Sequence, residues 1–115
     1  MTSSNLHRGD TTLVPFPLSD PNAVRRRPVV VVSTDLYNAN TGEVIVAQLT
    51  TRSRANPRMG DHIVVDWEDA GLLGPTTARS RLVTVSSGRV LRKLGTLSRR
   101  DMEALSQWLR RVLEL

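Results

Sequence analysis

The sequence predicts an α+β fold, a small and mostly antiparallel β-barrel that carries a C-terminal α-helix. Five or six short segments rich in β-branched residues alternate with turn residues, and the last part of the chain has helical periodicity. A length of 115 residues leaves room for one hydrophobic core, and no repeat or linker interrupts the chain. We therefore expect residues 1–115 to form a single domain.

The first half of the chain holds three predicted strands. Residues 11–16 form the first, and a turn-rich loop over residues 18–27 follows it. Residues 28–33 are apolar on both faces, which is typical of a central strand. After one expected helical turn at residues 35–40, the third strand spans residues 43–50. One face of this strand carries Ile45, Ala47 and Leu49, and the other carries Val46, Gln48 and Thr50.

The second half predicts shorter strands and one clear helix. A polar loop at residues 51–60 precedes a strand at 61–66, a strand around 82–85 and a short strand at 89–91. Ser98 and Asp101 resemble a capping box, which places the start of the helix. Apolar residues then recur at helical spacing, and we expect this stripe to pack on the sheet. Its members are Met102, Leu105, Leu109 and Val112, widened by Trp108 and Leu113.

The charge balance suggests a polyanionic partner. The net charge is +5, and fifteen of the sixteen basic residues are arginine. The planar guanidinium binds two phosphate oxygens at once, whereas aromatic residues, at 3%, are too few for a base-stacking platform. A GC-rich genome that encodes arginine in place of lysine explains the same bias, so composition alone does not name the partner.

Several kinds of chemistry are excluded by the residues themselves. The chain has no cysteine, and His7 and His62 are its two histidines, so a zinc motif or a serine triad has no basis. Neither standard glycine-rich phosphate loop is present. We expect no metal and no cofactor, and we interpret His62 as a half-exposed strand residue. The longest aliphatic run is residues 29–32, so we expect a soluble cytoplasmic protein.

Arginine and hydroxyl groups remain as candidates for chemistry. Arg27 precedes Pro28 at the start of the most apolar strand, which favours a fixed, extended backbone. Thr50 ends the next strand, and antiparallel pairing would bring the two residues side by side. A guanidinium and a hydroxyl at one strand edge form a plausible phosphate site. A purely structural role for each residue remains the alternative.

Four blocks of sequence resemble the MazF/PemK (Kid) family of toxin endoribonucleases from toxin–antitoxin pairs. They are HRGD at 7–10, RRPVVVVS at 26–33, IVAQLTTR at 45–52 and KLGTLS at 93–98. The resemblance implies an SH3-like barrel of the CcdB/Kid/MazF kind and a homodimer. It also implies a toxin that inhibits translation and growth by metal-independent cleavage of single-stranded RNA, leaving a 2′,3′-cyclic phosphate and a 5′-hydroxyl.

The same resemblance assigns roles to residues. Arg27 matches the catalytic arginine and Thr50 the catalytic threonine. Because a guanidinium keeps its proton far above neutral pH, we assign Arg27 charge stabilisation and proton donation, not the role of base. We expect a second set of residues to contact RNA, and an antitoxin with an acidic tail to occupy the same groove. That set is Arg25, Arg26, Thr51, Arg52 and Arg81.

One stretch departs from the family pattern, and two other functions stay open. Arg79, Ser80 and Arg81 stand where many relatives have an acidic residue or glutamine, so sequence preference does not carry over. The alternative to an enzyme is a non-catalytic module of the same fold that binds RNA or sequesters an antitoxin. A gyrase poison like CcdB is disfavoured because that family needs a Trp-Gly-Ile tail, and this sequence ends in VLEL.

Overall fold

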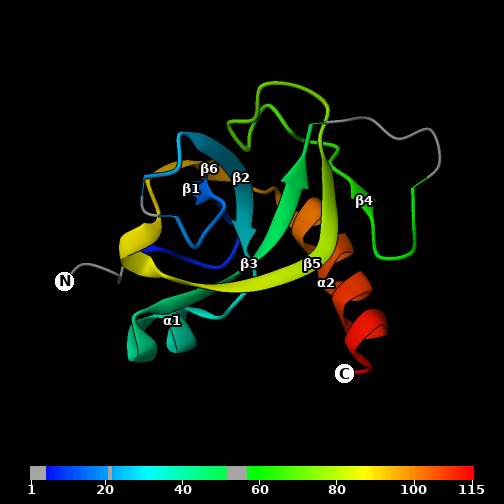
Figure 1. Cartoon of the computed structure of the whole chain (residues 1–115). Coiled ribbons are helices and arrows are strands. Elements are labelled where there is room, and N and C mark those ends of the chain that lie inside the picture. The colour runs from blue at the N-terminus through cyan, green and yellow to red at the C-terminus, as the bar shows by residue number, and fades with distance from the viewer. Residues whose placement is uncertain (1–4, 21, 52–56) are drawn as a thin grey trace.

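The structure, a computed structural model, describes residues 5–20, 22–51 and 57–115. Within these ranges it contains six strands, two α-helices and a short 3₁₀ turn, η2 (Figure 1). The strands are β1 (Asp10–Phe16), β2 (Arg25–Val31), β3 (Glu43–Thr50), β4 (His62–Ile63), β5 (Thr77–Ser86) and β6 (Arg92–Thr96). The helices are α1 (Asp35–Thr41) and α2 (Arg99–Leu113), and η2 spans Ser87–Arg89.

The strands form one curled antiparallel sheet in the order β4-β5-β3-β2-β1-β6, so β3 and β2 lie at its centre. Helix α2 packs behind β5 at one side of this sheet, and α1 projects at the end where β2 leads into β3 (Figure 1). The prediction of a mostly antiparallel, barrel-like sheet with a C-terminal helix is confirmed.

Apolar residues are buried on both faces of the central strands. Val30, Ala47 and Leu49 face α2 and pack against its Leu105 and Leu109. The opposite face is enclosed by the curl of the sheet and holds a second cluster. This cluster contains Val14, Val29, Val31, Val44, Val46 and Val85. The uninterrupted apolar run of β2 is therefore explained, because alternate residues enter two separate cores.

Strand β2 begins three residues before the predicted strand, so the end of the predicted loop at 18–27 is wrong. Arg25, Arg26 and Arg27 lie opposite Phe16, Pro15 and Val14 of β1. The hairpin with β1 supplies this pairing before β3 joins at Val29. Charged side chains fit there because this end of β2 pairs with β1 but not with β3, so it lies at the edge of the ladder.

The last two predicted strands also differ. Residues 87–89 form η2, and β6 follows it at Arg92–Thr96 in place of the strand predicted at 89–91. Strand β6 pairs with β1 at the sheet edge, so its polar side chains stay exposed and leave no apolar pattern to detect.

Strand β4 is shorter than the strand predicted at 61–66. It ends early because the N–H groups of Val65 and Asp66 donate to the Asp101 carboxylate.

Helix α2 has the predicted cap, but its apolar contact with the sheet is shorter than predicted. The Ser98 Oγ accepts a hydrogen bond from the Asp101 N–H, which confirms the start of the helix. Leu105 and Leu109 are buried as expected. Val112 and Leu113 are 43% and 49% exposed, so the prediction that they pack on the sheet is wrong. The last turn of α2 extends past the strands (Figure 1).

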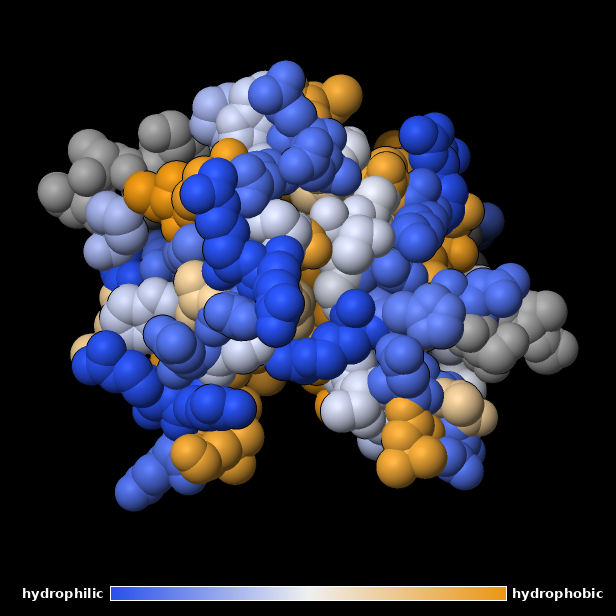
Figure 2. Space-filling view, turned by 180° about the vertical axis from the view of Figure 1, so that it is seen from behind, coloured by the Kyte–Doolittle hydropathy of each residue, from blue (hydrophilic) through white to orange (hydrophobic). Residues whose placement is uncertain are grey.

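Hydrophilic residues cover most of the face seen from behind, and the apolar residues on it lie in separate patches (Figure 2). Neither described helix is both long enough and apolar enough to cross a membrane.

Candidate functional site

Arg27 and Thr50 both lie at the rim of the sheet, near the start of β2 and at the end of β3. The two strands are antiparallel, and their pairing begins with Val29 opposite Gln48, so Arg27 and Thr50 each lie two residues beyond this pair, at the same end of the two strands. Both residues are half-buried. They line a single pocket of about 480 Å³, which we call the rim pocket. The two candidates singled out by strand order are therefore brought together.

The rim pocket is suited to an anion. Its lining residues are Arg26, Arg27, Pro28, Leu49, Thr50, Thr51 and Arg79. Within the described part of the chain, the lining contributes three guanidinium groups and two hydroxyl groups and no carboxylate. Guanidinium groups offer forked donors that match phosphate oxygens, and several like charges around one cavity concentrate its positive potential.

The Arg27 side chain is oriented by an aromatic ring. Its Cζ lies 4.6 Å from the centroid of the Phe16 ring on β1. This is the geometry of a cation–π contact, which restricts the guanidinium without occupying its N–H donors. Arg27 is also held through its backbone, since it lies opposite Val14 in the β1–β2 ladder. The donors of Arg27 are thus positioned before any ligand arrives.

Arg79 is a site residue that the sequence reasoning missed. Between Leu82, opposite Ala47, and Ala78, opposite Leu49, strand β5 has two more residues than β3, so it bulges. The bulge brings the Arg79 side chain, only 8% exposed, into the lining of the rim pocket. No periodicity in the sequence signals this, because a bulge interrupts the alternation that a strand would otherwise follow.

Arg79 has an incomplete set of partners. Its Nε lies 3.4 Å from the Oδ1 of Asp61, whose side chain is also buried. Within the described residues that Nε makes no hydrogen bond. A buried charge is normally both paired and hydrogen-bonded, so the charge of Arg79 depends on Asp61 for its compensation.

The remaining predicted contacts are distributed around the rim. Arg26 and Thr51 line the rim pocket, and both are exposed. Arg81 is exposed and lines a neighbouring apolar pocket of about 360 Å³. Arg25 is exposed at the outer end of β2 and lines neither pocket. Arg52 lies outside the described residues.

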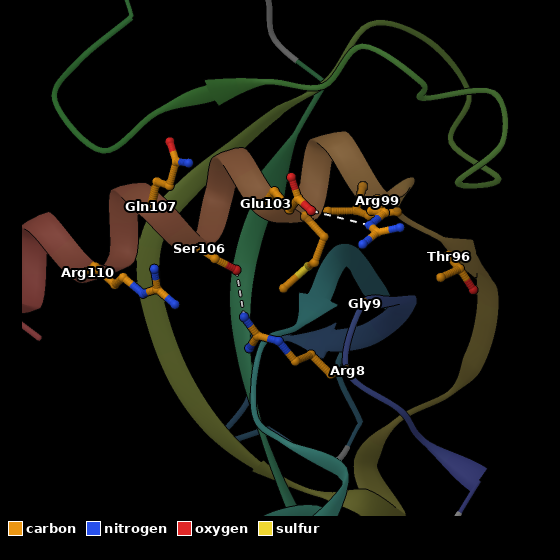
Figure 3. A pocket seen from close by; sticks show the side chains of 10 residues that line it. Arg8, Gly9, Thr96, Arg99, Glu103, Ser106, Gln107 and Arg110 are labelled. Carbon is orange, nitrogen blue, oxygen red and sulfur yellow. Dashed lines mark hydrogen bonds and ion pairs between the residues drawn. The ribbon is translucent and has the colours of Figure 1, made fainter.

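A further pocket, of about 640 Å³, lies between α2 and the turn before β1 (Figure 3). It adjoins the far end of β2 at Val31, which is about 13 Å from Arg27 at the usual rise per strand residue. Two of its three arginines, Arg8 and Arg99, are already engaged. The Arg8 Nη2 donates to the Ser106 Oγ at 2.6 Å, and the Arg99 Nε lies 3.3 Å from the Glu103 Oε1. This pocket is less suited than the rim pocket to an added phosphate.

The start of α2 holds a buried carboxylate with a structural role. Asp101 is fully buried and accepts hydrogen bonds from the Val65 and Asp66 N–H groups and from the Ser98 hydroxyl. Its Oδ1 also lies 2.7 Å from the His62 Nε2. Burial by itself raises the pKa of Asp101, but these hydrogen bonds together bring that pKa below its ordinary value. His62 is thus partly buried against Asp101, where a half-exposed residue was expected.

Within residues 5–20, 22–51 and 57–115, no three histidine, aspartate or glutamate side chains gather closely enough to hold a metal ion.

Comparison with protein families gives one match over most of the chain. A family model described as the PemK-like, MazF-like toxin of type II toxin–antitoxin systems matches residues 7–113. None of the curated proteins matches the sequence.

Several solved structures share the fold. An endoribonuclease from mycobacterial species, in complex with its cognate antitoxin, has a TM-score of 0.77 and 18% identity, over 95% of each chain. The Mycobacterium tuberculosis toxin MazF-mt6 has a TM-score of 0.72 and 20% identity, over 92% of this chain and 97% of that one. A MazE–MazF structure from Deinococcus radiodurans has a TM-score of 0.74 and 18% identity, over 95% and 96%. The curled sheet with its C-terminal helix is therefore the fold of these proteins.

Proposed function

Because the chain belongs to the PemK-like, MazF-like family of toxins of type II toxin–antitoxin systems, we propose that it is an endoribonuclease that cleaves single-stranded RNA. The observation that carries this proposal is that Arg27 and Thr50 line one cationic pocket. The solved structures of the same fold include proteins described as endoribonucleases, which supports the assignment.

In the proposed reaction, the ribose 2′-oxygen attacks the adjacent phosphorus. A bond forms between this oxygen and phosphorus, and the bond from phosphorus to the 5′-oxygen of the next nucleotide breaks. The 2′-hydroxyl loses its proton to solvent, and the departing 5′-oxygen gains one. The products are a 2′,3′-cyclic phosphate and a 5′-hydroxyl, and no step requires a metal ion.

The rim pocket offers a group for each demand of this reaction. The pentacoordinate phosphorus gathers negative charge, which preorganised donors stabilise more strongly than they stabilise the substrate. We assign charge stabilisation and proton donation to the 5′-oxygen to Arg27. Thr50 supplies a hydroxyl that donates to a phosphate oxygen. Arg79 adds a second guanidinium from β5, and Arg26 and Thr51 hold the RNA strand at the pocket mouth.

We also propose the partners that this function requires. An antitoxin with an acidic segment would compete with RNA for the rim pocket, since three arginines and no carboxylate line the described part of it. Solved relatives in complex with an antitoxin support this partner. A homodimer acting in the cytoplasm would give the RNA a longer surface than one chain of 115 residues offers. Arg25, Arg52 and Arg81 are proposed contacts on that surface.

The test uses purified full-length protein, freed of antitoxin, and an unstructured RNA in EDTA. We expect cleavage that leaves 5′-hydroxyl ends. Arg27→Ala and Thr50→Val should each lower kcat by about 100-fold or more, which is typical of removing one transition-state donor. Arg110→Ala changes an exposed arginine of α2 and serves as the matched control.

Binding measured in parallel separates the two functions. If the wild-type protein leaves RNA intact and Arg27→Ala binds RNA as tightly as the wild type, the protein is a non-catalytic binding module. Thermal unfolding of each variant shows whether a loss of activity comes from a loss of fold.

A further inference from the structure

An apolar pocket adjoins the rim pocket and shares one wall with it. This pocket, which we call the side pocket, has a volume of about 360 Å³. Arg27 lines both pockets, so its guanidinium stands between a cationic cavity and an apolar one. The apolar walls of the side pocket include Val14, Phe16, Val29, Leu82 and Val83.

This arrangement matches two neighbouring nucleotides of one strand, joined by the phosphate between them. A nucleobase is joined through one ribose to its phosphate, so a phosphate held at Arg27 places its base beside the rim pocket. The volume lies in the range of about 300–1,000 Å³ that is usual for small-molecule sites. On the other side of the rim, a second apolar pocket of about 370 Å³ shares Arg26, Pro28 and Thr51 with the rim pocket. A cationic site between two apolar sites has the order base, phosphate, base.

Among the residues that line the side pocket, Gln48 has a side chain that carries an amide group. It is half-buried in β3 with Val29 opposite it on β2, and on the other side it faces the bulge of β5. A strand neighbour on each side restricts the position of the Gln48 backbone. Arg81 also lines this pocket, but its side chain is exposed and has more freedom to move.

We propose that the side pocket binds the nucleobase next to the scissile phosphate and that Gln48 selects adenine there. A glutamine amide donates one hydrogen bond and accepts another, and it pairs in this bidentate way with the amino group and ring nitrogen of adenine. The inference rests on the proposed function, because it assigns a base preference to the same cleavage site.

The experiment maps the ends left on a long RNA by the full-length protein in EDTA. We expect adenine to be enriched at one position next to the cut. Gln48→Leu should reduce that preference by about 5- to 150-fold, the discrimination usual for one bidentate contact. Gln48→Glu should shift the preference toward cytosine, since a carboxylate accepts from the cytosine amino group.

The matched control is Gln107→Leu, which changes the other glutamine of the chain, exposed on α2. It should leave the preference unchanged. A second readout does not depend on long RNA. Adenosine monophosphate should inhibit cleavage more strongly than uridine monophosphate, and Gln48→Leu should remove that difference.

The outcomes separate the two proposals. If the wild-type protein does not cleave RNA, the proposed function fails and the base preference fails with it. If wild type and a folded Gln48→Leu variant cut with the same preference, the inference is overturned and the endoribonuclease stands. An unchanged base preference is also expected if an antitoxin side chain or a second copy of the chain fills the side pocket in place of a base.

Discussion

The Arg27 guanidinium lies over the Phe16 ring, with 4.6 Å between its Cζ and the ring centroid. The two residues come from neighbouring strands, β2 and β1, and both line the side pocket. Because Arg27 also lines the rim pocket, the contact with Phe16 sets the position of the one side chain that the two pockets share.

Replacing Phe16 should therefore affect catalysis more than stability. Phe16 is 42% exposed, so Phe16→Leu removes little buried surface. An exposed cation–π contact contributes about 0.5–1 kcal/mol, so we expect kcat for RNA cleavage to fall by about two- to fivefold. Phe16→Tyr keeps a ring in place and should retain wild-type kcat. Equal kcat values for Phe16→Leu and wild type would show that the ring does not position Arg27.

The buried pair of Arg79 and Asp61 should contribute to stability as well as to the site. Either Arg79→Met or Asp61→Asn leaves one buried charge without its partner, which costs about 3–5 kcal/mol. The double variant should be more stable than either single variant, as measured by urea unfolding. Among variants that stay folded, those without Arg79 should cleave RNA more slowly. Strictly additive effects on stability would mean that the two side chains do not interact.

Asp101 should couple the stability of the protein to acid. Its pKa lies below the ordinary value of 3.8 in the folded state, so the stability that it contributes is present above that value. This contribution is lost as the pH falls through the folded pKa. Asp101→Asn should lower the free energy of unfolding by about 1–3 kcal/mol near neutral pH. The difference from wild type should shrink below about pH 4.

Urea unfolding at several pH values measures this effect. Glu103→Gln, which changes an exposed carboxylate of α2, is the control and should show little change at any pH. A difference between Asp101→Asn and wild type that stays constant down to about pH 2 would contradict the role given to the carboxylate.

RNA binding should depend on salt in proportion to the phosphates contacted. For single strands, the logarithm of affinity falls with the logarithm of salt concentration by about 0.7 for each phosphate neutralised. Arg26→Gln removes one guanidinium from the rim pocket and should reduce that slope by about 0.7. Arg110→Gln on α2 should leave the slope unchanged. If both variants change the slope equally, RNA does not bind at the rim in particular.

That Arg27 and Thr50 lie at the same end of neighbouring strands could be predicted from the sequence, because it depends on local rules. An apolar run marks β2 as a central strand, alternation marks the two faces of β3, and antiparallel neighbours bring the start of one beside the end of the other. The cap at Ser98 follows from equally local chemistry.

The predictions from the sequence were wrong where a segment takes its structure from a partner that is distant in the chain. The polar strand β6 forms because β1 offers an edge, and β4 ends early because Asp101 of α2 binds the N–H groups that follow it. Composition near these segments contains no information about either partner. The half-exposed last turn of α2 has a similar origin, since the periodicity of a helix does not show where the sheet beneath it ends.

By itself, the sequence determined the class of fold, the central strands and the residue types that can hold a phosphate, because hydrophobic alternation and strand order are local properties. Only the tertiary structure decided which arginines line the rim pocket. Arg79 enters the rim pocket through a bulge in β5, and Arg25, only two residues from Arg27, lines neither the rim pocket nor the side pocket. The physical reason is that a shift of one residue in the register between paired strands changes the face to which a side chain points. That register depends on contacts across the whole sheet.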